Sequence, residues 1–203
     1  MILAFDTSSA ACTAALFDGA GTCVARRDEV IGRGHSERLV PMLAEILDGR
    51  RPDSVIVGVG PGSFTGIRVA IAAAHGLAIG WGAELRGMSS LALLAAGVET
   101  SRDVAAAVAG GHGEVFVQQF DGASLDERSK LLNLPPGAAA EQVAADLVIG
   151  SGARQLVEAR GWGEARDGLP SAACLPRLPE RLRSLAPRPV YARAPDARPR
   201  QAA

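Results

Sequence analysis

The order of apolar and polar residues along the chain predicts an α/β fold. Three short segments at the start, the first of them apolar, predict strands at 2–6, 11–17 and 22–31. The turn sequence DGAG separates the second run from the third, so these two should form a hairpin. If Phe17 pairs with Thr22 in that hairpin, Cys12 lies opposite Arg27.

The segment 35–47, HSERLVPMLAEIL, has the period of an amphipathic helix. Its apolar stripe comprises Leu39, Val40, Leu43, Ile46 and Leu47. Ser36 is a candidate N-cap. Pro41 conflicts with that start, because proline removes a hydrogen bond in the second turn. We therefore expect the helix to begin later or to bend at Pro41.

Alternating strands and helices continue beyond this helix. We expect a strand at 54–59, a helix at 67–80, a strand at 83–88 and a helix at 89–97. After a boundary at 99–102, a strand pair joined by the turn GGHG opens the second half as a hairpin opens the first. This similarity suggests two related domains, at 1–98 and 99–194, followed by a disordered tail at 195–203.

The segment 66–80 is apolar on nearly all sides. Small residues recur every four positions in two stripes, Gly66, Ala70, Ala74 and Ala78 in one and Ala72, Gly76 and Gly80 in the other. Its own sheet can cover one side only, and small residues let a second helix approach the other closely. We therefore predict a helix-bundle interface of about 1,600 Å² built from 36–48 and 66–80.

The candidate interface residues are Met42, Ile46, Ile67, Arg68, Ala70, Ile71, Ala74, His75 and Ala78. Provided that Ala74 lies on the exposed side, Ala74→Glu should abolish partner binding and leave the chain folded.

The loop GPGSFTG before this helix lacks the lysine and the spacing of a phosphate-binding P-loop. It also lacks the glycine spacing of a nucleophile elbow, and it matches the dinucleotide fingerprint only weakly. A tight strand-to-helix turn, capped by Ser63 or Thr65, accounts for it better.

Composition narrows the classes of function. The chain has 203 residues, 48% of them hydrophobic, and a net charge of −1, so it is globular and not basic overall. Three cysteines without a CxxC pair fit a reducing cytosol. We see no signal peptide, and the apolar run 69–81 is too short to span a bilayer, so we expect a cytoplasmic protein without a membrane contact.

Two further segments are candidates for nucleotide chemistry. In actin-like folds a turn such as DTSS, here with Asp6, Thr7 and Ser8, holds ATP phosphates, although local backbone hydrogen bonds explain the tetrapeptide better. VIGSGA, with Gly150 and Gly152, is similar to the adenosine loop of such folds, and a helix-start turn is the alternative. The three histidines have no metal-ligand spacing, so we expect no metal site.

Taken together, ILAFDTSSAACTAAL, HSERLVPML and GVGPGSFTGIRVAIAAAHGLAIG resemble the bacterial TsaB (YeaZ) family of threonylcarbamoyladenosine biosynthesis. GEVFVQQF and PVYARAPDA agree more loosely. The resemblance covers most of the chain and is strongest over 1–98.

The resemblance implies two actin-like domains of the sugar kinase and Hsp70 superfamily, the second reduced. It also implies that this chain is a non-catalytic partner of the TsaD subunit. That subunit transfers a threonylcarbamoyl group to the tRNA adenosine beside the anticodon, and a TsaE-like ATPase joins the pair. Family members pair through the helices corresponding to 36–48 and 66–80, and with themselves when the partner is absent. No cofactor is expected on this chain alone, and ATP or ADP would belong to the interface of the complex.

Two alternatives stay open. A small actin-fold ATPase or phosphotransferase would use Asp6, Thr7 and Ser8. Phosphoryl transfer, however, needs more charge stabilisation than this turn provides, because it has one acid and no lysine nearby. A peptidase lacks support from any nucleophile–base pair. The Arg-rich segment 177–203 has seven arginines and two acids. We expect a solvated surface there, and the alternative hypothesis is that part of the segment contacts tRNA phosphates.

Overall fold

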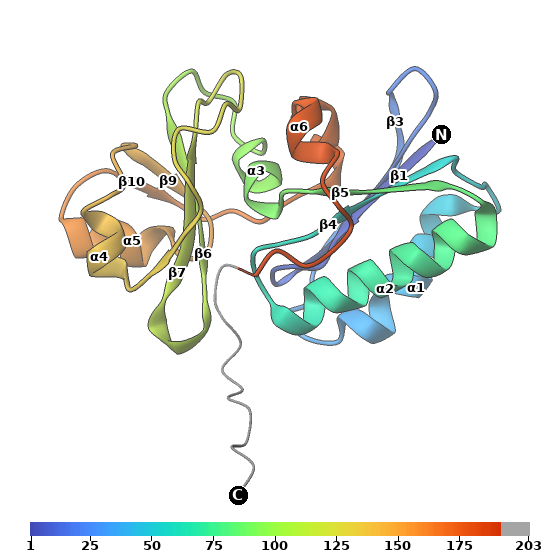
Figure 1. Cartoon of the computed structure of the whole chain (residues 1–203), viewed down its shortest axis with the longest axis horizontal. Helices are drawn as coiled ribbons and strands as arrows, with labels where there is room; N and C mark the ends of the chain where they lie inside the picture. The colour runs from blue at the N-terminus through green and yellow to red at the C-terminus, as the bar shows by residue number, and fades with distance from the viewer. Residues whose placement is uncertain (192–203) are drawn as a thin grey trace, which may run out of the picture.

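A computed structural model describes residues 1–191 as two five-stranded sheets that lie side by side (Figure 1). The first half of the chain forms β1 (Ile2–Asp6), β2 (Ala11–Phe17), β3 (Cys23–Val30), α1 (His35–Leu47), β4 (Ser54–Gly58), α2 (Phe64–Trp81), β5 (Glu84–Met88) and α3 (Ser90–Ala95). The first sheet has the order β3-β2-β1-β4-β5. Strand β2 is antiparallel to β1 and β3, whereas β1, β4 and β5 are parallel.

The second sheet repeats this arrangement. Its elements are β6 (Val104–Ala109), the 3-10 turn η1 (Gly111–Gly113), β7 (Val115–Phe120), β8 (Leu132–Leu134), α4 (Pro136–Ala140), β9 (Leu147–Ile149), α5 (Ala153–Arg160) and β10 (Glu164–Arg166). From the opposite edge, the order of this sheet is β8-β7-β6-β9-β10, and each strand corresponds to one in β3-β2-β1-β4-β5 of the first sheet. Strand β7, like β2, is antiparallel to both of its neighbours. Helix α4 has 5 residues where α1 has 13, so the second unit is the reduced one. The prediction of an α/β protein built from two related units, the second reduced, is confirmed.

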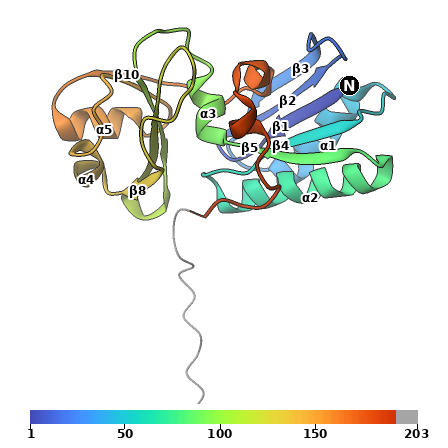
Figure 2. The ribbon, with the colours of Figure 1, turned by 45° about the horizontal axis from the view of Figure 1, so that its top comes forward.

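The alternation of side chains along the strands creates two apolar faces on each sheet. In β1, Leu3 and Phe5 pack toward α1 and α2, whereas Ala4 belongs to the core on the other face. In β6, Ala105 and Ala107 pack toward α4 and α5 in the same way. Helices α1 and α2 thus cover one outer face of the molecule, and α4 and α5 cover the other (Figures 1 and 2).

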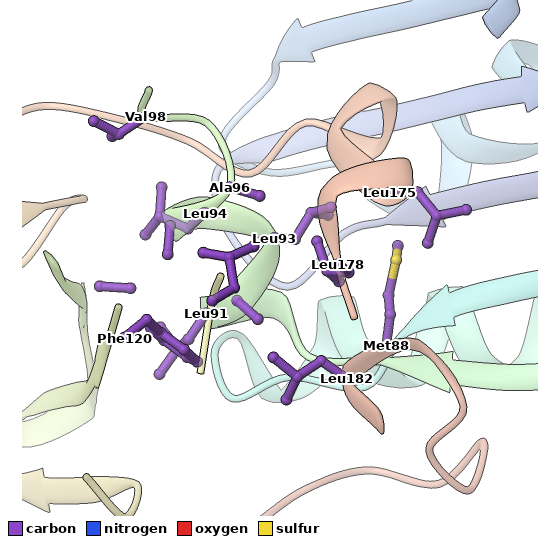
Figure 3. Packing of buried hydrophobic residues seen from close by; sticks show 14 of the residues in the cluster. Met88, Leu91, Leu93, Leu94, Ala96, Val98, Phe120, Leu175, Leu178 and Leu182 are labelled. Carbon is purple, nitrogen blue, oxygen red and sulfur yellow. The ribbon is translucent and has the colours of Figure 1, made fainter. Parts of the chain in front are cut away.

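The central core joins the two sheets. Helix α3 is buried over its whole length between them, and Leu91, Leu93 and Leu94 are at most 1% exposed. Phe120 of β7 and Met88 of β5 meet this helix from the second and the first sheet respectively (Figure 3). Leucines of the 3-10 helix η2 (Ala172–Arg177) and of α6 (Glu180–Arg183) complete the cluster. The two units are therefore packed together through a shared apolar layer.

The last described residues return to the first sheet. The backbone N–H of Ala172 donates to Oγ1 of Thr13 in β2 at 2.8 Å. Further on, Gly87 and Leu185 form an antiparallel bridge, and the N–H of Val190 donates to the carbonyl of Val59 at 2.9 Å. Residues 172–191 were assigned from the sequence to the second domain, but these contacts attach them to the first sheet as well.

The predicted hairpin register needs correction, and the predicted tail lies outside the described residues. A bulge between Leu16 and Phe17 shifts the hairpin register, so Phe17 pairs with Cys23, not Thr22, and Cys12 pairs with Glu29, not Arg27. The tail predicted at 195–203 lies beyond the described residues.

The start of α1 also differs from the prediction. The helix begins at His35 after Gly34, whose φ of 88° suits a residue without a side chain. Ser36 is inside the helix, where its hydroxyl donates to Glu37 Oε2 at 2.8 Å, so it is not the N-cap. The helix does not begin later on account of Pro41, but continues through this residue to Leu47 and forgoes one hydrogen bond there.

Candidate partner interface

The glycine loop before α2 packs directly on the DTSS turn after β1. The N–H of Ser63 donates to the carbonyl of Ser8 at 2.7 Å, and the Thr7 hydroxyl donates to the carbonyl of Gly66 at 2.7 Å. A Cβ atom on Gly66 would lie 1.9 Å from the carbonyl oxygen of Thr7, so only glycine permits this approach. The Ser63 side chain accepts from the Gly66 N–H at 3.2 Å and caps α2, as one of the two predicted caps.

The carboxylate of Asp6 is enclosed by hydroxyl and amide donors. It is fully buried, and its Oδ1 accepts from the N–H and the hydroxyl of Ser8 at 2.7 and 2.6 Å. Its Oδ2 accepts from the hydroxyl of Ser90 at the start of α3. A Cβ on Gly58 would lie 1.8 Å from Oδ2, so β4 also closes over this group. Both oxygens of Asp6 are thus engaged inside the protein.

The turn between β9 and α5 that contains VIGSGA is equally compact. Gly150 has a φ of +116°, and a Cβ there would lie 2.2 Å from the carbonyl oxygen of Ala107. A Cβ on Gly152 would approach Val115 and Val108 to between 3.1 and 3.2 Å. Gly150 is thus required by the packing of the turn on the hairpin β6–β7, and a side chain at Gly152 would be crowded. Within residues 1–191 no group of three or more metal-ligating side chains comes together.

Helix α2 has one buried and one exposed side, each with its own stripe of small residues. Gly66, Ala70, Ala74 and Ala78 are buried against the first sheet. Ala72, Gly76 and Gly80 are exposed. Arg68 and His75, the two polar residues of the helix after Thr65, lie on the exposed side, as does Ile79, which is 82% exposed. The helix is therefore covered on one side only by its own domain.

This orientation corrects most of the predicted interface. Seven of the nine candidate residues are buried in the chain's own structure and do not form a surface, namely Met42, Ile46, Ile67, Ala70, Ile71, Ala74 and Ala78. Arg68 and His75 are exposed. A groove lies between the two helices on their outer side, but these seven residues belong to the opposite, buried side, and an interface built from the two helices stays a prediction. The condition on Ala74→Glu, an exposed Ala74, is not met.

An apolar groove runs between α1 and α2 on their outer side. Its volume is about 270 Å³, and its lining residues are Val40, Leu43, Ala44, Leu47, Ala73, Gly76 and Leu77. Val40, expected in the buried stripe of α1, is 61% exposed at its edge. The sequence signal that identifies this groove is the second small-residue stripe of α2, through Gly76, because a glycine there leaves room between the helices.

Charged side chains border α1 on the side away from α2. The guanidinium of Arg38 donates two hydrogen bonds to Glu29 of β3, at 2.7 and 2.6 Å, and two to Glu45, at 2.8 and 3.3 Å. These hydrogen bonds lower the pKa of both carboxyl groups. Arg38 thus fixes α1 to the edge strand β3 and leaves the apolar groove as the open part of this surface.

Arginines of the C-terminal segment have partners inside the protein. Arg177 donates to the carbonyls of Ala96 and Val98. Arg181 donates to Oδ1 of Asp126 at 2.5 Å and Arg183 to Oε2 of Glu180 at 3.1 Å. Arg177, Arg181 and Arg183 thus have partners within the structure, and the tRNA contact predicted for part of 177–203 stays a prediction.

By length and composition alone, α2 would also suit a membrane crossing, with 18 residues and a mean hydropathy of 1.3. It extends beyond the run 69–81 that was judged too short. Core helices pass the same test, and Ile67, Ala70 and Ala74 pack against the first sheet in this structure. The feature is weak evidence for a membrane span.

The fold and the groove define a class, an α/β protein of two related units whose first unit has an apolar groove between α1 and α2. The sequence profile of the TsaD family, tRNA N6-adenosine threonylcarbamoyltransferase, matches residues 28–149. The TsaB protein of Escherichia coli is 36% identical over 127 residues, and that of Haemophilus influenzae 35%. These alignments cover 59% and 58% of this chain, and the chain spans about half the length of these relatives, 54% and 52%.

Two solved structures from Pseudomonas aeruginosa match over nearly the whole fold. One is described as an uncharacterized protein with similarity to the peptidase YeaZ, with 32% identity and a TM-score of 0.80 over 95% of this chain and 99% of that one. The other is YeaZ itself, with 31% identity and a TM-score of 0.78 over 94% and 98%. The chain belongs to the TsaB (YeaZ) family.

Proposed function

We propose that this chain is a non-catalytic subunit in the formation of threonylcarbamoyladenosine on tRNA, where it pairs with a TsaD-like threonylcarbamoyltransferase. The observation that carries the proposal is the uncovered apolar groove between α1 and α2. An apolar, concave helix surface of this kind fits a helix of a protein partner and offers no reactive group to a substrate. The names of the TsaB relatives support the choice of pathway.

The environment of Asp6 supports a role without chemistry of its own. A catalytic carboxylate must reach a substrate, a metal ion or a proton that is transferred. Here both oxygens of Asp6 accept hydrogen bonds from Ser8 and Ser90 under the close cover of Gly58. In this account Asp6 holds the glycine loop and α3 in place, and through them the start of α2.

The remaining partners follow from the same proposal. A TsaE-like ATPase joins the pair, tRNA is bound by the assembled complex, and ATP or ADP binds at the interface of the complex, not on this chain alone. In the absence of the partner, the same groove would support a homodimer. The complex would work in the cytoplasm, where its tRNA substrate is found.

Reconstitution tests the proposal. The purified chain, the TsaD-like and TsaE-like proteins of the same organism, tRNA, ATP and a threonylcarbamoyl donor are combined, and the nucleosides are analysed by mass spectrometry. We expect threonylcarbamoyladenosine only when this chain and the TsaD-like protein are both present. Full product formation without this chain, or product formed by this chain alone, would contradict the proposal.

A further inference from the structure

Two exposed aromatic rings lie together at the start of α2, although they come from distant parts of the sequence. Phe64 is the first residue of α2 and is 62% exposed, and Tyr191 is 51% exposed. Their ring centroids are 6.0 Å apart, with 35° between the planes. The hydrogen bond from Val190 to Val59 holds the C-terminal segment beside the glycine loop and so brings Tyr191 to this place.

The guanidinium of Arg68, one helical turn after Phe64, packs on both rings. Its central carbon lies 3.2 Å from the centroid of Phe64 and 5.4 Å from that of Tyr191. Stacking of this kind uses the flat faces of the guanidinium and leaves the N–H donors along its edge available. Among residues 1–191, no group donates to or accepts from the side chain of Arg68, and no carboxylate lies within 4.0 Å of it. The two rings thus hold the guanidinium in place, and its N–H donors are not used by residues 1–191.

This cluster is continuous with the apolar groove. Phe64, Arg68 and Ala72 follow one another at four-residue intervals on the exposed side of α2, and the next position, Gly76, lines the groove. From Phe64 to Gly76 the helix advances about 18 Å. A partner helix seated in the groove and aligned with α2 would therefore extend over the cluster.

We propose that Phe64, Arg68 and Tyr191 form an anchor for the TsaD-like partner, and that Arg68 binds a carboxylate of that partner through its free edge. The inference rests on the proposed function and adds a second, charged contact to the apolar groove. Tyrosine and arginine are enriched among residues whose truncation weakens an interface most. A guanidinium already fixed by two rings loses little conformational entropy when it binds a carboxylate.

The surroundings favour a protein carboxylate over RNA phosphate. Arg68 is the single arginine or lysine of α2, and the nearest part of the same surface, the groove, is apolar. On α1, Arg38 is already paired with Glu29 and Glu45. Binding of an RNA backbone depends on several cations in a row, whereas α1 and α2 together have one arginine without a carboxylate partner, Arg68.

Calorimetric titration of the full-length chain with the purified TsaD-like protein tests the anchor. Arg68→Ala and Tyr191→Ala should each raise the Kd about tenfold or more, and Arg68→Lys should weaken binding as well, because lysine lacks the flat fork. Trp162→Ala is the matched control, since Trp162 is 47% exposed and stacks with Arg160 at 3.7 Å in the second unit. Its Kd should stay within about twofold of the unsubstituted chain.

The possible results separate the inference from the function on which it rests. If the unsubstituted chain binds and all three variants bind equally well, the anchor is wrong and the proposed function stands. If the variants lose tRNA binding but keep their affinity for the partner, the cluster is an RNA site and the anchor is again wrong. If the unsubstituted chain does not bind, the proposed function and the anchor both fail.

Discussion

The hydroxyl of Ser90 donates to Oδ2 of Asp6 and accepts a hydrogen bond of 3.1 Å from the N–H of Gly60. Ser90 belongs to α3 in the central core, Asp6 ends β1, and Gly60 begins the loop that leads into α2. One hydroxyl thus connects the shared core of the two units with the loop that leads into α2, one of the two helices that line the apolar groove. The acid that resembles a catalytic group has a structural role in this arrangement.

Asp6→Asn should therefore destabilise the fold. An amide has one acceptor oxygen in place of two, so either Ser90 or Ser8 loses its acceptor in a fully buried site. We expect a loss of about 1–3 kcal/mol in the free energy of unfolding, measured by urea denaturation. Asp167→Asn, at a well-exposed side chain, should change stability by less than about 0.5 kcal/mol. Equal stability of the two variants would contradict the structural role.

The purified chain alone should not hydrolyse ATP above background. Its Asp6 carboxylate is already bonded on both oxygens, and opening this site would break the contact between the glycine loop and the DTSS turn. A coupled assay of phosphate release measures the rate. A robust rate that Asp6→Asn abolishes in a still folded protein would favour the alternative, an actin-fold ATPase.

Glutamate at Ala74 should unfold the chain, whereas glutamate at Ala72 should not. Ala74 is 0% exposed in the core under the first sheet, and an unpaired buried charge costs several kcal/mol. Ala72, two residues earlier, is exposed and does not line the groove. Thermal unfolding followed by circular dichroism compares the two variants. A folded Ala74→Glu chain with normal stability would show that the buried side of α2 is assigned wrongly.

Asp121 should contribute to stability in a defined pH range. Its carboxylate accepts from the N–H groups of Ser124 and Ala123 and pairs with Arg128, and these contacts lower its pKa from 3.8 to about 2. Because the folded pKa is below the unfolded value, the stabilisation is present above pH 4 and is lost as the pH falls toward 2.

Comparison of Asp121→Asn with the unsubstituted chain isolates this charge, because asparagine keeps the acceptor for both N–H groups. The unsubstituted chain should have the higher Tm at pH 7, and the two values should converge between about pH 4 and pH 2. A Tm difference that is independent of pH over this range would contradict the assignment.

The sequence was sufficient for the α/β fold and for the positions of α1 and α2, but not for the side of α2 that stays exposed. In α1 the polar residues Arg38 and Glu45 orient the helix, and four of the five predicted stripe residues are buried. In α2 the apolar residues surround the helix, and both small-residue stripes fit close packing. The sequence pattern of α2 therefore does not distinguish the side that packs on the sheet, with Ala74, from the exposed side, with Gly76.

Contacts over long distances in the sequence were also beyond local patterns. Tyr191 and Phe64 meet only because residues 185–190 run along β5 and the end of β4, and nothing near either residue indicates this. The bulge at Phe17 depends likewise on the detailed geometry of the hairpin turn. The sequence DTSS is typical of a phosphate-binding turn. In this structure the turn is instead hydrogen-bonded to the glycine loop of the same chain.

The central claim, that the groove between α1 and α2 receives the TsaD-like partner, is tested most directly by Gly76→Glu. Gly76 lines the groove, and a Cβ there meets no atom within 4 Å, so the free chain should stay folded and gain about 0.5–1 kcal/mol of helix stability. Gly137→Glu is the control, at an exposed and equally unobstructed glycine of α4.

Calorimetric titration with the purified TsaD-like protein gives the Kd of each variant. We expect Gly76→Glu to weaken binding about a hundredfold or more, because it places an unpaired charge in a dry interface, and Gly137→Glu to bind like the unsubstituted chain. A folded Gly76→Glu chain that binds the partner with unchanged Kd would contradict the account.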